Sequence, residues 1–102
     1  MIHVIATIEL KPGCRPEYLQ VLKSNVPHVK AEDGCLAYEP TVGVDAGLPV
    51  QGVLRENVVI LVEAWESVDA LHAHLKTPHM AGYREAVQDM VVKLTVDVLE
   101  PV

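Results

Sequence analysis

Residues 58–66, which read VVILVEAWE, constrain the fold more than any other segment. Strand alternation places 58, 60, 62 and 64 on one face and 59, 61, 63 and 65 on the other, and both faces are largely apolar. A strand with two apolar faces must be covered on both sides. Glu63 is the one acidic residue among them. The segment therefore predicts a buried strand with one carboxylate, that of Glu63, within its two apolar faces.

The first half of the chain predicts a strand, a helix and a second strand. Residues 2–10 alternate apolar and polar positions, which predicts the first strand. After a Lys-Pro-Gly turn, Pro16 suits the first turn of a helix, whose apolar spacing continues to Val26. Pro27 should disturb this helix late, and Asp33-Gly34 should end it. Residues 35–44 predict a strand, and 43–57 predict a long loop or irregular hairpin that could cover a pocket or brace a dimer.

The second half predicts a broken helical region and a last strand. Ser67 is suited to cap one helix, and Thr77-Pro78 is suited to start another. Apolar positions 80, 83, 87 and 91 should then share one helix face, and 94–98 alternate as a strand. The order β-α-β-β-α-β predicts one α+β domain over residues 1–102, with a ferredoxin-like four-stranded antiparallel sheet.

Such a sheet has helices on one face only, so its other face needs a cover. A second copy of the same sheet is the simplest one, which predicts a twofold homodimer. The net charge of −6 and the scattered eight Lys and Arg argue against binding nucleic acid or an anionic membrane. The sequence has no membrane-length apolar run and no signal-peptide pattern, so we expect a cytoplasmic protein whose Cys14 and Cys35 are free thiols.

Three segments together resemble the antibiotic-biosynthesis monooxygenase-like (ABM) family, in particular its quinol monooxygenase branch. They are ATIELKPG at 6–13, EDGCLAYE at 32–39 and VEAWESVDALHAHLKTPHM at 62–80. The third is the most specific, because E-x-W-x-S is followed by A-L-x-x-H-L and then T-P-H. The resemblance implies a dimeric α+β barrel with a pocket between the sheet and the helices of each subunit.

The resemblance also implies a choice of reactions. Some members oxygenate quinol-like aromatic molecules with molecular oxygen and no metal or flavin, while others isomerise small phosphorylated sugars or degrade haem. The haem-degrading members use an Asn and a His where this chain has Ala6 and Arg84. We therefore predict a cofactor-independent monooxygenase of a small aromatic or quinol-like molecule. The alternatives are an isomerase of a small hydroxyketone and a non-catalytic ligand-binding or stress-response dimer.

Three residues are candidates for proton transfer. His74 and His79 lie at the expected helix break, and histidine can act as a base near neutral pH. The alternative for both is local capping on a solvent-facing helix. Glu63, on an apolar strand, could be a base with a raised pKa, or it could pair with Arg55, Arg84 or a Lys of a partner subunit.

Three aromatic residues are candidates for substrate binding. Trp65 could stack on an aromatic ligand, and Tyr38 and Tyr83 could donate to an oxyanion. The alternative for each is a place in the core or the dimer interface. The cysteines have no paired histidine and no zinc-ligand spacing, so we expect neither cysteine catalysis nor a metal site.

Overall fold

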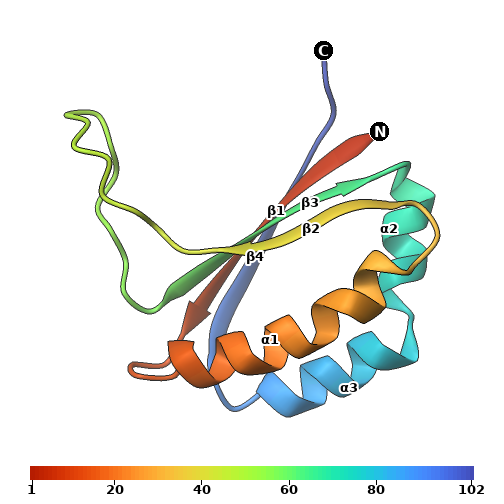
Figure 1. Cartoon of the computed structure of the whole chain (residues 1–102), viewed down its shortest axis with the longest axis horizontal. Coiled ribbons are helices and arrows are strands. Elements are labelled where there is room, and N and C mark those ends of the chain that lie inside the picture. The colour runs from red at the N-terminus through yellow and green to blue at the C-terminus, as the bar shows by residue number, and fades with distance from the viewer.

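A computed structural model describes all 102 residues of the chain. Its elements confirm the expected ferredoxin-like order, with the second helical region divided into two helices (Figure 1). They are β1 (Ile2–Leu10), α1 (Arg15–Lys30), β2 (Cys35–Thr41), β3 (Val58–Trp65), α2 (Val68–Leu75), α3 (Pro78–Val87) and β4 (Val91–Leu99).

The four strands form one antiparallel sheet in the order β2-β3-β1-β4. The centre of the sheet is the β1–β3 pair, in which Ile2 lies opposite Trp65 and Ile8 lies opposite Val59. Alternate residues of β1, from Ile2 to Leu10, are buried against the helices, which lie along one face of the sheet (Figure 1). The strand alternation of the sequence therefore decides which side chains face the helical layer.

The break between α2 and α3 has the two caps that the sequence predicts. The Ser67 hydroxyl accepts a hydrogen bond from the Ala70 amide at 3.1 Å, at the start of α2. The Thr77 hydroxyl accepts one from the Met80 amide at 3.4 Å, and Pro78 is the first residue of α3. Each cap satisfies an N–H that the first helical turn leaves without a partner, so the restart at Thr77 is confirmed.

Two details of the helices differ from expectation. Pro27 lies within α1, which continues to Lys30. Proline has no amide N–H and so removes one backbone hydrogen bond, and α1 tolerates this loss because it falls near the last turn of a long helix. The expected extension of the α3 face to Val91 is wrong, since α3 ends at Val87 and Val91 begins β4. The apolar spacing of positions 80, 83, 87 and 91 therefore continues past the end of α3 into β4.

The helical layer does not cover the whole sheet. Leu94, Val96 and Val98 of β4 lie opposite β1 residues that are buried on the helical side. They are nevertheless 58%, 48% and 48% exposed. We call these three residues the β4 wall. It is an apolar strip that the described chain leaves open.

Residues 42–57 contain no helix or strand, which confirms the expected long loop, although β2 ends at Thr41 rather than at residue 44. The loop extends away from the body of the domain (Figure 1). It exposes several apolar side chains, with Val50 and Val53 at 93% and 90%. No helix is long and apolar enough to cross a membrane.

Candidate active site

A cavity of about 120 Å³ lies between the sheet and the helices, near the α2–α3 break. All four strands and two of the helices contribute to its wall, which is apolar except for a few polar groups. The lining residues are Val4, Ala6, Ile8, Tyr38, Leu61, Glu63, Leu71, His74, Leu75, Met80, Tyr83, Leu94 and Val96. An apolar hollow with a small number of polar groups is the usual form of a small-molecule site.

His74 is the most deeply buried histidine, with 2% of its surface exposed. Its Nδ1 lies 2.9 Å and 3.1 Å from the two carboxylate oxygens of Glu32. One of those oxygens also lies 2.7 Å from Nε2 of His79. Nε2 of His74 has no hydrogen-bond partner in the protein. Because no fully buried polar side-chain atom lacks a partner, Nε2 is not fully buried. His74 lines the cavity, so Nε2 is the ring nitrogen available to a bound molecule.

Glu63 enters the same cavity from β3. It is 5% exposed, and one of its oxygens accepts a hydrogen bond of 2.9 Å from the indole N–H of Trp65. The ring of Trp65 in turn lies 4.6 Å from that of His74, between centroids. Trp65 thus touches both titratable groups of the cavity. We call Glu32, Glu63, Trp65, His74 and His79 the polar cluster.

The cavity shifts its two titratable groups in opposite directions. Burial raises the pKa of the Glu63 carboxyl to about 7, although the Trp65 hydrogen bond lowers it, and the charge of Glu32 adds to the rise. Burial lowers the pKa of His74, against the hydrogen bond and the charge of Glu32, which raise it. Both shifts favour the neutral form, as desolvation does. Near neutral pH the cavity therefore holds a neutral His74 imidazole and a Glu63 carboxyl that is about half protonated.

Three tyrosines lie near this pair, of which Tyr18 and Tyr38 are buried and Tyr83 is partly buried. The hydroxyls of Tyr18 and Tyr83 are hydrogen-bonded to each other, and the ring of Tyr38 meets that of His74 edge-on at 5.5 Å. Burial is the largest cause that raises the pKa of Tyr18, Tyr38 and Tyr83. All three hydroxyls therefore keep their protons and can act as hydrogen-bond donors.

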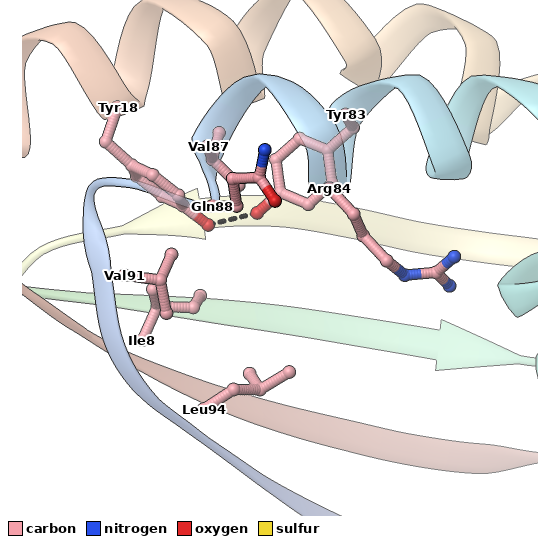
Figure 2. Close-up of a pocket in the computed structure, with 8 residues that line it drawn as sticks. All are labelled: Ile8, Tyr18, Tyr83, Arg84, Val87, Gln88, Val91 and Leu94. Atoms are coloured by element: carbon pink, nitrogen blue, oxygen red, sulfur yellow. Dashed lines mark hydrogen bonds between the residues drawn. The ribbon is translucent and has the colours of Figure 1, made fainter.

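A second cavity, of about 180 Å³, lies beside the first (Figure 2). The two share Ile8, Tyr83 and Leu94 as lining residues, so Tyr83 forms part of the wall between them. Figure 2 shows the paired hydroxyls of Tyr18 and Tyr83 at one side of this cavity and Leu94 of the β4 wall at the other. A ligand larger than a single ring would have to reach past Tyr83.

The structure brings most of the predicted site residues together. Glu63, His74, Tyr38 and Tyr83 line the first cavity. His79 does not line it but contacts Glu32 from outside, with 26% of its side chain exposed. Among these lining residues, two lie on strands and two on the helices α2 and α3, so no single segment of sequence encodes the site.

Two predicted interactions differ from what the structure shows. Trp65 lies behind the cavity wall, fully buried against Glu63 and His74, and has no face toward the hollow. Glu63 has no ion pair with Arg55 or Arg84, since Arg84 donates to the carbonyl of Leu75 instead. The indole N–H of Trp65 donates to the Glu63 carboxylate instead, because residues two positions apart on a strand point to the same side of the sheet.

The residue that sequence reasoning missed is Glu32. It follows the end of α1, just before Gly34, whose φ of +84° favours glycine. A Cβ at position 34 would lie 2.7 Å from the Cβ of Ala70, so glycine lets this turn approach α2 closely. Asp33-Gly34 predicts the end of the helix, but nothing local shows that the Glu32 carboxylate meets two histidines more than 40 residues away.

The fold and the cavity define a class: a small α+β domain with an apolar pocket that contains a buried histidine and a buried carboxyl group. Comparison with known proteins identifies the class more closely. Residues 1–86 match the family described as "Antibiotic biosynthesis monooxygenase". The chain is also 40% identical over 103 aligned residues to the Escherichia coli (strain K12) protein named "Probable quinol monooxygenase YgiN", covering 99% of this chain and 98% of that one. This chain belongs to the antibiotic biosynthesis monooxygenase family.

Solved structures agree on the fold. Rv0793 from Mycobacterium tuberculosis superposes with a TM-score of 0.80 at 27% identity, covering 99% of this chain and 94% of that one. PA3566 from Pseudomonas aeruginosa gives a TM-score of 0.82 at 23% identity, covering 99% and 93%. The second likeness speaks for the fold alone. No group of three or more His, Cys, Asp or Glu side chains is arranged to hold a metal ion.

Proposed function

We propose that this protein is a cofactor-independent monooxygenase of a small quinol-like aromatic molecule. The observation that carries the proposal is the pair formed by His74 and Glu63, one with a free ring nitrogen and the other with a raised carboxyl pKa, inside an otherwise apolar cavity. Pairs of titratable groups whose environments push their pKa values apart are a mark of acid–base sites. The family and the name of the E. coli relative support the same reaction class.

The size of the cavity favours a single aromatic ring. An engineered apolar cavity of about 150 Å³ is known to bind benzene, and this one measures about 120 Å³. A quinol ring presents two hydroxyls on an apolar frame, which matches a hollow that has a few polar groups on an apolar wall. A second fused ring or a side chain would extend toward the neighbouring cavity behind Tyr83.

In the proposed reaction, Nε2 of His74 takes a hydroxyl proton from the quinol, and the protonated Glu63 carboxyl donates to the developing oxyanion. The electron-rich ring then reduces molecular oxygen, which is the second substrate. One oxygen atom forms a bond to a ring carbon and the other leaves as water. The quinol supplies all the electrons, so the products are a hydroxyquinone and one water for each oxygen molecule consumed.

We further propose that the protein acts as a homodimer in the cytoplasm. The β4 wall supports the dimer, since apolar strips of this kind mark an interaction surface and two of its residues, Leu94 and Val96, also line the cavity. A second copy that covered the β4 wall would close that side of the pocket. The two free thiols, Cys14 and Cys35, support a reducing compartment.

Oxygen uptake tests the proposed function. Purified protein, treated with chelator and free of flavin, should consume one oxygen molecule per molecule of at least one quinol in a panel of one-ring and two-ring compounds. With isotopically labelled oxygen gas, one labelled atom should appear in the organic product and one in water. Proton exchange on a hydroxyketone without oxygen uptake would instead identify an isomerase, and ligand binding without either reaction would exclude both activities.

A further inference from the structure

Glu32 has an unusual environment for a carboxylate on a small acidic protein. Its side chain is 11% exposed, and its hydrogen-bond partners are two imidazoles rather than a Lys or Arg. The two histidines come from different helices, α2 and α3, on either side of the break at Thr77. An almost buried carboxylate needs hydrogen-bond donors around it, and here the donors can only be ring N–H groups.

This contact determines which nitrogen of His74 carries the proton. An ionised carboxylate only accepts hydrogen bonds, so Nδ1 of His74, at 2.9 Å and 3.1 Å from its oxygens, must be N–H. A neutral imidazole has one N–H, and its other nitrogen is then an acceptor. Nε2, on the cavity side, therefore has the lone pair that a base requires. A carboxylate that holds the far side of an imidazole fixes both its tautomer and its ring orientation.

His79 holds the carboxylate from the other side. Its Nε2 lies 2.7 Å from the Glu32 oxygen that is also the closer one to His74. The ring of His28, on α1, lies 5.8 Å from that of His79 and has no hydrogen bond to Glu32. His79 thus donates the second N–H to Glu32 without touching the cavity, and it restricts the rotation of the carboxylate that His74 needs.

We propose that Glu32 is the positioning residue of the site: it holds His74 in the Nδ1–H tautomer, with Nε2 presented to the substrate, and His79 keeps Glu32 in place. The catalytic part of this proposal rests on the proposed function, in which His74 is the base. The structural part does not, because the tautomer exists in the protein whether or not a quinol is its substrate. The two parts can therefore fail separately.

Nitrogen NMR of histidine-labelled full-length protein tests the structural part. In the wild type at a pH where His74 is neutral, Nδ1 should carry the proton and Nε2 should not. In Glu32→Ala this preference should be lost, whereas in Asp33→Ala, a change at the adjacent exposed acid, it should persist. A wild-type His74 protonated at Nε2 overturns the proposal, whatever the activity.

Turnover of a quinol identified by oxygen uptake tests the catalytic part. Glu32→Ala should lower kcat by about 10- to 100-fold with KM changed by less than about twofold, the usual cost of losing a carboxylate that orients an imidazole. Glu32→Gln, whose carbonyl can still accept from Nδ1, should recover part of that loss. His79→Gln should have a smaller effect of the same kind, and His28→Gln none.

A folded Glu32→Ala variant with wild-type kcat overturns the proposal. If Glu32→Ala does not fold, Glu32→Gln decides. A kcat that falls together with the share of the Nδ1–H tautomer, or that stays at the wild-type level while the tautomer is preserved, supports the proposal, and a kcat that changes independently of the tautomer overturns it.

Discussion

The polar cluster and the β4 wall lie at the same cavity and are built in opposite ways. In the polar cluster, hydrogen bonds connect Glu32 to both histidines and Trp65 to Glu63, and all of these contacts come from one chain. The β4 wall is apolar, lacks a helical cover and leaves about half of each side chain in solvent. A single chain therefore completes the polar cluster by itself but leaves one side of the cavity open.

This contrast has an energetic basis. A buried charge or hydrogen-bond donor must have its partner at all times, because leaving it unsatisfied costs several times more than exposing a methyl group. Buried polar groups therefore need hydrogen-bond partners from within the same folded chain. Apolar surface tolerates a temporary contact with water, so the β4 wall can remain exposed until a second molecule binds.

Loss of the base should have the largest effect. His74→Ala should lower kcat by about 10²- to 10⁴-fold, which is the usual contribution of general base catalysis. The matched control is His72→Ala, an exposed histidine on the same helix, which should leave kcat unchanged. Steady-state oxygen uptake with a quinol found in the panel measures both. Equal rates for wild type and His74→Ala would show that the polar cluster is structural.

Glu63 should make stability depend on pH. Its pKa is about 7 in the folded protein against an ordinary value of 4.5, so the folded state holds the proton more tightly. Its contribution is complete below pH 4.5 and is lost as pH rises through 7, which lowers the free energy of unfolding by about 3 kcal/mol.

Urea unfolding at pH 5 and pH 8 measures this effect, as the change in the free energy of unfolding between the two pH values compared across variants. Glu63→Gln should remove the loss, because a neutral amide can still accept from Trp65 and does not titrate. Glu85→Gln, at an exposed acid on α3, should keep the wild-type dependence. An identical pH dependence in wild type and Glu63→Gln would contradict the raised carboxyl pKa.

The open regions should respond to assembly rather than to chemistry. Val98 belongs to the β4 wall, is 48% exposed and does not line the cavity. If a second copy covers this wall, a Lys there would bury an unpaired charge, so Val98→Lys should shift the mass in light scattering from twice 11.2 kDa toward 11.2 kDa. Val68→Lys, at an exposed valine on α2, should stay dimeric. A wild-type protein that is monomeric at micromolar concentration would rule out this part of the account.

The smallest expected effect concerns the junction between α2 and α3. Thr77 accepts a hydrogen bond from the Met80 amide and donates one of 2.9 Å to the carbonyl of His74. Thr77→Ala should therefore lower the free energy of unfolding by about 0.5–2 kcal/mol, and Thr77→Ser, which keeps the hydroxyl, by much less. Denaturant titration compares the three proteins. A stability unchanged in the alanine variant would mean that the cap does not hold the junction.

Local signals predicted the fold well because each element has its own pattern. The alternation in β1, the strand over Val58–Trp65 and the caps at Ser67 and Thr77 are all confirmed. Each depends on neighbours within a few residues of sequence. Element ends were less predictable: the apolar spacing that includes Val91 looks the same whether the chain continues as a helix or turns into a strand.

The site was predictable only in its composition. Glu63 and His74 stand out locally, one as a charge on an apolar strand and the other as a histidine near a helix break. Glu32 does not stand out, because its role depends on contacts with His74 and His79, which are distant in sequence. Trp65 shows the same limit: sequence reveals a strand tryptophan, but only packing shows that its N–H is directed to Glu63 rather than its ring to a ligand.

The pH dependence of kcat/KM in wild type and Glu63→Gln tests the acid–base assignment most directly, since kcat/KM reports the ionisable groups of the free enzyme. If neutral His74 is the base and protonated Glu63 the donor, wild-type kcat/KM should fall as pH rises through about 7, the pKa of the Glu63 carboxyl in the free protein. Glu63→Gln keeps an N–H donor at every pH, so the alkaline fall should disappear. A wild-type kcat/KM that instead rises through pH 7, with that rise absent in Glu63→Gln, would make Glu63 the base and contradict the account.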